Sequence, residues 1–308
     1  MSKDVVIAAV GDLLMKPLLY RKIKPGDTFH TKEGQDAFEK VFQPVSPFFK
    51  NADLTIGNLE VTFAGDISYK DHHDPKNRNP RFKCPDTFAS ALKSVGFDVL
   101  TTANNHCMDF GIPGLIRTLD VLDKNGIAHT GTYRNKKESQ LLCVQNVEGI
   151  RIGILSYTRD TNKRPVPKGQ PAGVKIINRS SIKEDLKRLR KKADFIIVSM
   201  HCGYEYSHKP AAHQKKLVDF LFRHGADVVL GSHPHVLQPA EIRHVTDVDG
   251  KKRKRFAIYS LGNFVSTRLR GMDAALTGMI IRIKLRKSKG GSVKLTGAKL
   301  GSKRGIQT

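Results

Sequence analysis

Short runs of apolar residues recur along most of the chain, and segments with a different period separate them. Each run is about as long as one buried strand, and they lie at Val5–Val10, Leu54–Ile56, Val99–Thr102, Ile152–Ser156, Phe195–Met200 and Val228–Leu230. Between these runs, apolar positions recur at helical spacing in Pro85–Val95, Pro113–Asn125, Ser180–Lys192 and Pro210–His224. Strands that alternate with helices predict an α/β fold.

Local signals mark the ends of the helical segments. Pro113 and Pro210 suit a first helical turn, and Ser180–Ser181 ahead of Glu184 form a capping pattern. A glycine follows three of the segments, where a left-handed cap is favoured, at Gly96, Gly126 and Gly225.

The last third of the chain has an antiparallel pattern. Ile242–Val245 and Phe256–Leu261 flank an Asp249–Gly250 turn and predict a hairpin, and Leu276–Leu285 predicts another strand. An antiparallel section after alternating strands and helices predicts two packed mixed sheets flanked by helices. We expect a single domain over residues 1–286 and a basic tail, mobile at its end, over 287–308. Loops are expected at Tyr20–Gly34, Thr62–Pro80 and Asp160–Gly173.

The composition is that of an ordinary globular protein. The 308 residues are 39% hydrophobic and 27% charged, which is enough to build a core without staples. The cysteines form no C-x-x-C pair and disfavour a disulfide framework; they are Cys84, Cys107, Cys143 and Cys202. The run Val5–Val10 is too short for a signal peptide or membrane span, which predicts a cytoplasmic chain. A chain separated from an N-terminal membrane anchor would show the same pattern and would be membrane-associated.

The net charge of +24 is the most unusual bulk property. A positive field of this size concentrates polyanions, so nucleic acid, an anionic membrane and an acidic polymer all fit, as does a plain solubility bias. The excess gathers in Lys183–Lys192, Lys251–Arg255 and the residues after Leu285. Aromatic residues are rare in these stretches, which disfavours nucleic acid held by base stacking.

Polar residues that suit chemistry gather in five short segments, each placed just after a predicted strand. They are Gly11–Asp12, Gly57–Glu60, Ala103–Asp109, Met200–Glu205 and Gly231–His235. Ligands bind at the carboxyl ends of strands in open α/β sheets, so we expect these segments to converge. Imidazole, carboxylate and amide oxygen together suit Mn, Fe or Zn, in one or two ions, and two ions sharing a carboxylate give a nucleophile at neutral pH.

The joined motifs resemble a known family. The segments GDLLM, GNLE, ANNHCMDFGIPGL, HCGYEY, GSHPHVLQPAE and YSLGNF, spread over about Val5 to Ile283, resemble the CapA/PgsA family of poly-gamma-glutamate capsule synthesis proteins. That family is similar in fold to the calcineurin-like metallophosphoesterases. The resemblance implies a four-layer αββα sandwich with mixed sheets and the site at one sheet edge.

The resemblance also assigns roles to residues. It implies that Asp12 and His235 hold a first metal, that Glu60 bridges, and that a second metal is held by Asn105, His201 and His233. His106 would face the substrate and protonate a leaving group or stabilise charge. The pattern departs from the phosphoesterases in two places. Leu14 stands where they usually have a histidine, and the bridging residue is glutamate rather than aspartate. The first metal position is therefore the weaker prediction.

Five further residues are predicted to touch the substrate or to hydrogen-bond a ligand. Glu205, four residues after His201, could orient that imidazole. The others follow strands or adjoin a motif and are Asn104, Tyr157, Asn162 and Asn263. Each of them also has an ordinary structural explanation as a turn former, a salt bridge or a core residue.

Three functions remain open from the sequence. The first is a metal-dependent hydrolase acting on a phosphoester or an amide-linked anionic substrate, linked to poly-gamma-glutamate metabolism. The second is a non-hydrolytic accessory protein that binds this polymer during capsule synthesis or export, with a membrane-associated synthase as partner. The third is nucleic-acid binding or processing, which rests on charge alone. The sequence predicts no oligomeric state.

Overall fold

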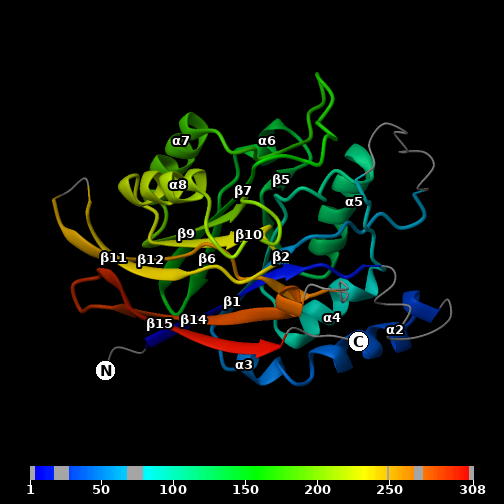
Figure 1. Cartoon of the computed structure of the whole chain (residues 1–308), viewed down its shortest axis with the longest axis horizontal. Coiled ribbons are helices and arrows are strands. Elements are labelled where there is room, and N and C mark those ends of the chain that lie inside the picture. Colours follow the sequence, from blue (N-terminus) through cyan, green and yellow to red (C-terminus); the bar gives the residue numbers. More distant parts are fainter. Residues whose placement is uncertain (1–3, 17–27, 68–78, 248–249, 267–272, 305–308) are drawn as a thin grey trace.

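Two β-sheets pack face to face, and helices cover the outer side of each, in a computed structural model of the chain (Figure 1). The structure describes residues 4–16, 28–67, 79–247, 250–266 and 273–304. The layers follow one another as helix, sheet, sheet and helix. This confirms the predicted four-layer αββα sandwich.

The first sheet has the strand order β15–β14–β1–β2–β3–β4, and β13 pairs with β1. Its strands are β1 (Asp4–Leu13), β2 (Leu54–Leu59), β3 (Val99–Thr101), β4 (Ala128–Thr130), β13 (Asn263–Val265), β14 (Thr277–Lys287) and β15 (Val293–Arg304). Strands β1 to β4 run parallel to one another. Strand β14 is antiparallel to both β1 and β15, so the sheet is mixed.

The second sheet has the order β11–β12–β10–β9–β7–β6. Its strands are β6 (Cys143–Val147), β7 (Ile150–Thr158), β9 (Phe195–His201), β10 (Val228–Ser232), β11 (Ala240–Thr246) and β12 (Lys252–Ile258). The central strands are parallel, and β6 and β11 are antiparallel edges. A separate pair joins β5 (Thr132–Tyr133) to β8 (Gly173–Val174).

Three of the four hydrophobic clusters among the described residues lie between the layers. One fills the space between the sheets, one lies between the first sheet and α2 to α4, and one lies between the second sheet and α7 and α8. The helices are α2 (Lys32–Phe42), α3 (Ser46–Lys50), α4 (Thr87–Val95), α5 (Gly111–Lys124), α6 (Lys136–Ser139), α7 (Arg179–Arg190) and α8 (Ala212–Arg223), with short 3-10 turns η1 (Thr28–His30) and η2 (Asp273–Leu276). Among the described residues, no helix has the length and apolar content needed to cross a membrane.

Three expectations need correction. The predicted tail contains β15, which pairs with β14 along its length, so residues as far as Arg304 belong to the sheet. The loop expected over Tyr20–Gly34 holds η1 and the start of α2 where it is described. The cap of α7 is Asn178, whose side chain accepts a hydrogen bond from the Ser181 amide, because an Asx side chain reaches the free N–H groups of the first turn.

Parts of some expected segments lie outside the described residues. These parts are 20–27 and 68–78 of two expected loops, Asp249 of the expected turn, and 305–308 of the expected tail.

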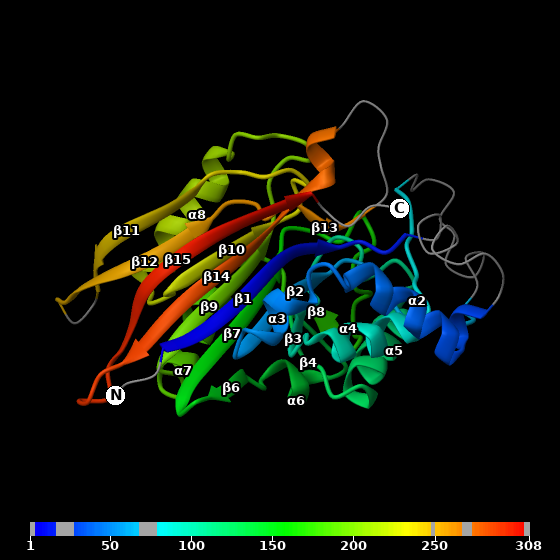
Figure 2. The same cartoon turned by 90° about the horizontal axis from the view of Figure 1, so that it is seen from below.

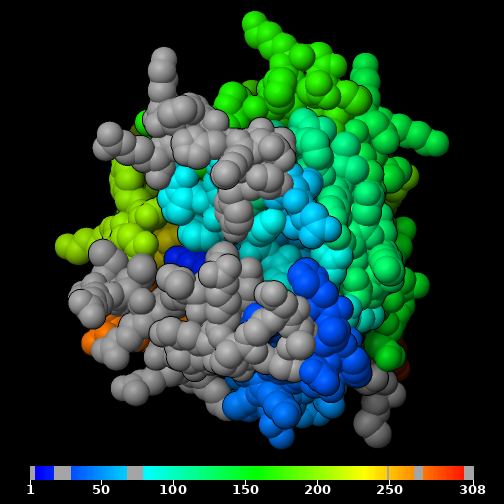
Figure 3. Space-filling model, turned by 90° about the vertical axis from the view of Figure 1, so that its right-hand side faces the viewer, coloured from blue at the N-terminus to red at the C-terminus, as the bar shows by residue number. Residues whose placement is uncertain are grey.

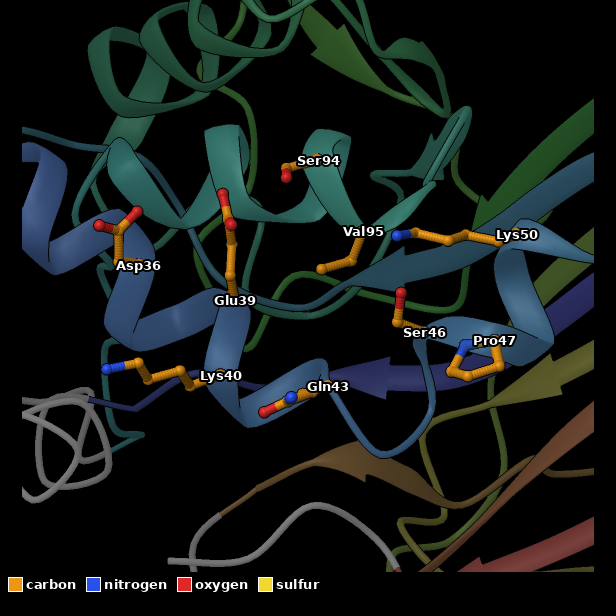
Figure 4. Close-up of a pocket in the computed structure, with 9 residues that line it drawn as sticks. All are labelled: Asp36, Glu39, Lys40, Gln43, Ser46, Pro47, Lys50, Ser94 and Val95. Atoms are coloured by element: carbon orange, nitrogen blue, oxygen red, sulfur yellow. The ribbon is translucent and has the colours of Figure 1, made fainter.

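The carboxyl ends of the parallel strands meet at one end of the sandwich. Strands β1, β2 and β3 of the first sheet end beside β9 and β10 of the second. Figure 3 shows this end of the molecule, where dark-blue, cyan and yellow-green segments, far apart in the sequence, come together. A cavity of about 620 Å³ lies elsewhere, among α2, α3 and α4 (Figure 4). None of the residues lining that cavity is a predicted site residue.

Candidate metal centre

Glu60 lies at the centre of the candidate site. It directly follows β2 and is fully buried, and neither of its carboxylate oxygens has a hydrogen-bond partner in the described structure. Two imidazole nitrogens approach the same oxygen: His201 Nε2 lies 3.5 Å from Glu60 Oε1, and His235 Nε2 lies 3.7 Å from it. A buried carboxylate without donors requires a nearby positive charge.

A first group of donor atoms joins Glu60 to Asp12 and His235, all within 4.8 Å of one another. Asp12 lies near the end of β1, where the register with β2 is irregular, and its Oδ1 accepts a hydrogen bond from Asn58 Nδ2 at 2.8 Å. Asp12 Oδ2 lies 3.1 Å from His235 Nδ1. Leu14 is buried in the cluster beneath α2 to α4 and adds no donor, so this group has three members.

Asn263 sets the orientation of the His235 ring. Its Nδ2 donates to the Ala275 carbonyl at 3.0 Å, so its Oδ1 faces His235 Nδ1 at 2.9 Å and accepts the proton there. The other ring nitrogen, Nε2, is therefore the one turned toward Glu60. Fixing the tautomer in this way is what residues around metal-binding histidines commonly do.

A second group joins Glu60 to His201 and His233. His201 Nε2 lies 2.8 Å from Asn105 Oδ1 and 3.2 Å from His233 Nδ1. Asn105 Nδ2 donates to Asn162 Oδ1 at 3.2 Å, which turns the Asn105 oxygen toward His201. Four side chains thus present donor atoms to one point.

The spacing of these atoms fits a bound cation. Two ligands at about 2.1 Å from one ion lie about 3.0–3.4 Å apart, and the contacts around Glu60 and His201 span 2.8 to 3.7 Å. The residues present therefore fit a pair of divalent ions that share Glu60, of the kind that nitrogen and oxygen donors favour.

The loop after β10 directs its two histidines to different groups. His233 and His235 both have positive φ, 97° and 59°, with Pro234 between them. Their ring centroids are 6.1 Å apart. This left-handed backbone is costly for residues with a Cβ, and such strain concentrates at functional sites. His233 accordingly joins the second group and His235 the first.

Electrostatics distinguish the two groups. Burial and the neighbouring Asp12 charge raise the pKa of Glu60 well above its usual value. Burial opposes ionisation of Asp12, but the His235 ring, whose Nδ1 lies 3.1 Å from Asp12 Oδ2, outweighs it and lowers the Asp12 pKa to about 2. Burial would lower the pKa of His235, yet the Glu60 and Asp12 carboxylates raise it to about 9. The metal-free first group therefore holds a proton on His235.

The imidazoles of the second group have the opposite tendency. Burial, and then the charge of His233, lower the pKa of His201 well below its usual value. Burial and the charge of His235 lower the pKa of His233. Both rings are neutral near pH 7, which is the state that binds a metal.

His106 lies in the turn after β3 and is held by Asp109. Its Nδ1 donates to Asp109 Oδ2 at 2.7 Å, and the same carboxylate accepts from the Phe82 amide at 2.7 Å and from Arg164 Nη1 at 3.1 Å. The Phe82 ring packs against the imidazole, with centroids 4.6 Å apart. These contacts commit Nδ1 of His106 to Asp109. Asp109 lies in the predicted segment Ala103–Asp109, but its pairing with His106 does not follow from the sequence alone.

Two of the remaining predicted residues have other roles. Tyr157 packs beneath α7 and its hydroxyl donates to Asp185 Oδ2 at 2.9 Å, because the strand directs this side chain to the outer face of the sheet. Glu205 is exposed, and Asn58 Nδ2, not Glu205, lies at 3.3 Å from His201 Nδ1. The negative charge of Glu205 favours the protonated forms of His233 and His235.

Asn104 and Lys16 complete the surroundings. Asn104 Nδ2 donates to the Leu59 carbonyl at 2.6 Å and its Oδ1 accepts from the His106 amide at 3.1 Å, so it ties the end of β2 to the turn. The sequence had not indicated Lys16. Its ammonium lies 5.0 Å from the Phe82 ring centroid, and its charge lowers the pKa of Glu60. Together with Asn58, it is the main residue that sequence reasoning missed.

Solved structures share this fold. The NAD nucleotidase NadN of Haemophilus influenzae has a TM-score of 0.53 and 14% identity over 97% of this chain and 56% of its own. A 5'-nucleotidase precursor from Thermus thermophilus has a TM-score of 0.52 and 15% identity over 97% and 54%. The chain therefore shares the fold of these nucleotidases, which is the metallophosphoesterase type of fold that the family resemblance implied.

The family follows from the sequence comparison. Residues 6–268 match the family described as bacterial capsule synthesis protein PGA_cap, and the chain belongs to that family. The PGA biosynthesis protein CapA of Bacillus subtilis is 29% identical over 96% of this chain and 72% of its own length. The capsule biosynthesis protein CapA of Bacillus anthracis is 30% identical over 91% and 65%. The chain thus spans about two thirds of these relatives.

Proposed function

We propose that this protein is a metal-dependent hydrolase that acts on a phosphoester or an amide-linked anionic substrate during poly-gamma-glutamate capsule metabolism. The observation that carries the proposal is Glu60, a buried carboxylate with no hydrogen-bond partner among the described residues, between two groups of metal-ligating side chains. Divalent ions held there would lower the pKa of water and so supply a nucleophile near neutral pH.

The chain's own residues would then handle the substrate. His106, held through Nδ1 by Asp109, would transfer a proton from Nε2 to the leaving group. Arg164 Nη1 donates to Asp109 Oδ1 at 3.1 Å and holds this carboxylate in place, so that the imidazole keeps one orientation. Lys16 brings a cation to the same region and would attract an anionic substrate.

The test is a comparison of metal content with turnover. Purified protein is stripped with a chelator, reloaded with Mn²⁺, Fe²⁺ or Zn²⁺, and assayed with p-nitrophenyl phosphate, bis-p-nitrophenyl phosphate and gamma-glutamyl p-nitroanilide. We expect metal-dependent turnover that His106→Ala reduces at least about 100-fold while the metal content stays the same. His30→Ala, at an exposed histidine, is the matched control and should keep full activity.

A non-hydrolytic accessory role is the second candidate, and the family's connection with capsule synthesis favours it. In that role the protein would bind poly-gamma-glutamate without cleaving it. Absence of turnover with every metal and substrate, together with retained polymer binding in Glu60→Gln and His233→Ala, would replace the first proposal by this one.

A further inference from the structure

The outer face of β14 carries a row of basic side chains. Ile281, Ile283 and Leu285 point into the core between the sheets. Side chains alternate along a strand, so the residues between them point away from that core, and they are Arg282, Lys284 and Arg286. Side chains on one face of a strand recur at about 6.8 Å, so these cations form a regular row.

Strand β15 adds a second basic row directly alongside. Lys299 pairs with Arg282, and Lys294 pairs with Arg286, across the antiparallel ladder. Like charges placed directly opposite each other destabilise a sheet. The five residues Arg282, Lys284, Arg286, Lys294 and Lys299 are called the basic face below.

Neighbouring carboxylates neutralise little of this charge. Arg286 forms a salt bridge with Asp4 at 2.6 Å, and Arg282 donates to the Asn51 carbonyl at 2.8 Å. Lys284, Lys294 and Lys299 form no ion pair within the described part of the chain. The basic face therefore keeps most of its positive charge.

No described helix covers the basic face. Helices α2, α3 and α4 pack against a cluster beneath β1 to β3 that reaches β14 only at Ile280, and Figure 2 shows the rest of β14 and β15 beyond the edge of that helical layer. Lys294, Lys299 and Arg286 are exposed, whereas Arg282 and Lys284 are half-buried. The result is an open, flat array of cations rather than a pocket.

We propose that the basic face binds a linear polycarboxylate, so that an extended anionic chain lies along β14 and β15 away from the metal centre. A polymer with one carboxylate per repeat offers charges at regular intervals to a regular row of cations. Neither strand contains an aromatic residue on which a base could stack, which disfavours nucleic acid. Where the side chains of both strands are described, the outward positions hold no exposed large apolar residue that could enter a lipid layer, which disfavours a membrane.

The inference rests on the proposed function only for the choice of polymer, poly-gamma-glutamate. Binding of fluorescently labelled poly-gamma-glutamate to the full chain is measured by anisotropy at low and moderate salt. The test variant is Lys284→Gln/Lys294→Gln/Lys299→Gln, which removes three cations that have no ion pair among the described residues. The matched control is Lys183→Gln/Lys187→Gln/Lys191→Gln, at exposed positions on or just after α7, with the same change in net charge.

We expect the test variant to bind the polymer at least about tenfold more weakly and with a shallower salt dependence, and the control to change less than about twofold. The melting temperature of the test variant should be unchanged or higher, because two like-charge pairs are relieved. The polymer should raise the melting temperature of the wild type and not that of the test variant.

Several results would overturn the inference. Equal weakening in both triple variants would mean that net charge alone binds the polymer, and no weakening in the test variant would mean that this face is not involved. Equal or tighter binding of a single-stranded oligonucleotide, or of phosphatidylglycerol vesicles, with the same dependence on the basic face would assign it to those partners. Loss of polymer binding in Glu60→Gln alone would place the polymer at the metal centre. If polymer binding depends on the basic face but the protein shows no turnover, this inference stands and only the hydrolase proposal is overturned.

Discussion

The two halves of the candidate metal centre share Glu60 but are built differently. The first combines two carboxylates, Asp12 and Glu60, with the single imidazole of His235. The second combines the shared carboxylate with two imidazoles, His201 and His233, and has the Asn105 oxygen 2.8 Å from His201 Nε2. One half is rich in negative charge and short of ligands, and the other is nearly neutral and more complete.

This difference decides in which half a metal ion must compete with a proton. In the first half the carboxylates raise the pKa of His235 to about 9, so a proton occupies the place of the cation at neutral pH. In the second half burial keeps His201 and His233 neutral. The acidic half must therefore release a proton before it binds metal, whereas the neutral half is ready to bind.

Removing the shared carboxylate should have the largest effect. Glu60→Gln takes a ligand from both halves, so we expect loss of both metals and a fall in turnover of at least about 1000-fold. Metal content by mass spectrometry and turnover of p-nitrophenyl phosphate measure this. Glu184→Gln, at an exposed glutamate of α7, is the control. Retention of two metals would show that Glu60 does not bridge.

The same variant should stabilise the metal-free protein. The folded-state pKa of Glu60 is raised, so its ionisation costs stability as the pH rises above the unfolded value of about 4.5. At pH 8 the free energy of unfolding of Glu60→Gln should thus exceed that of the wild type, and at pH 4 the two should agree. Thermal unfolding in the presence of a chelator gives the comparison.

Variants that disrupt one half at a time should show which half binds metal more tightly. His201→Ala removes a ligand from the more complete half, and we expect turnover to fall about 100-fold to 1000-fold with one metal lost. Asp12→Asn should weaken the first position and leave the second filled. Titration of each stripped variant with Mn²⁺ measures the affinities, and a first position that binds more tightly than the second would reverse the comparison.

The pH dependence of metal binding should separate the halves without mutation. Below a pKa of about 9 the proton on His235 competes with the metal, so affinity at the first position should rise by about ninefold from pH 7 to 8 and by about fivefold from pH 8 to 9. Affinity at the second position should rise less steeply over that range, because its histidines are already neutral and its only raised pKa is that of Glu60, which both positions share. Calorimetric titration at three pH values checks both slopes, and parallel slopes would contradict the assignment.

We expect the smallest effect on metal affinity from replacing the residues that orient the ligands. Asn263→Ala removes the acceptor for His235 Nδ1, and we expect metal affinity at the first position to fall about tenfold. Asn162→Ala removes the acceptor for the Asn105 amide and should do the same at the second position alone. An equal effect of either change on both positions would mean that the halves are not independent.

Much of the fold was readable from the sequence because buried strands of the two sheets are continuous apolar runs. Strand β9 and helix α4 begin and end within two residues of their predicted limits. Strand β15 was not readable, since its sequence mixes lysine, glycine and small residues and its position depends on pairing with β14. Helix α2 was not predicted either, because only three of its residues are buried: Gly34, Phe38 and Phe42.

The site was predictable to the level of which segments meet, but not of how each side chain points. The ligands follow strand ends, and parallel strands carry their ends to one edge. Asn58 and Lys16 were missed because their role depends on local register and side-chain direction near the irregular end of β1. Tyr157 was misplaced because the alternation of β7 turns it toward α7.

The pairing of β1 with β14 has a consequence for folding order. Asp4 and Arg286, joined across this pair, are 282 residues apart in the chain. During synthesis, at about 5–20 residues per second, β1 emerges early and waits for its partner until nearly the whole chain has left the ribosome. Until then the strand that carries Asp12 has an open edge, which is a template for aggregation. Nascent chains of this protein should therefore depend on chaperones, and translation stalled before Thr277 should yield an insoluble product.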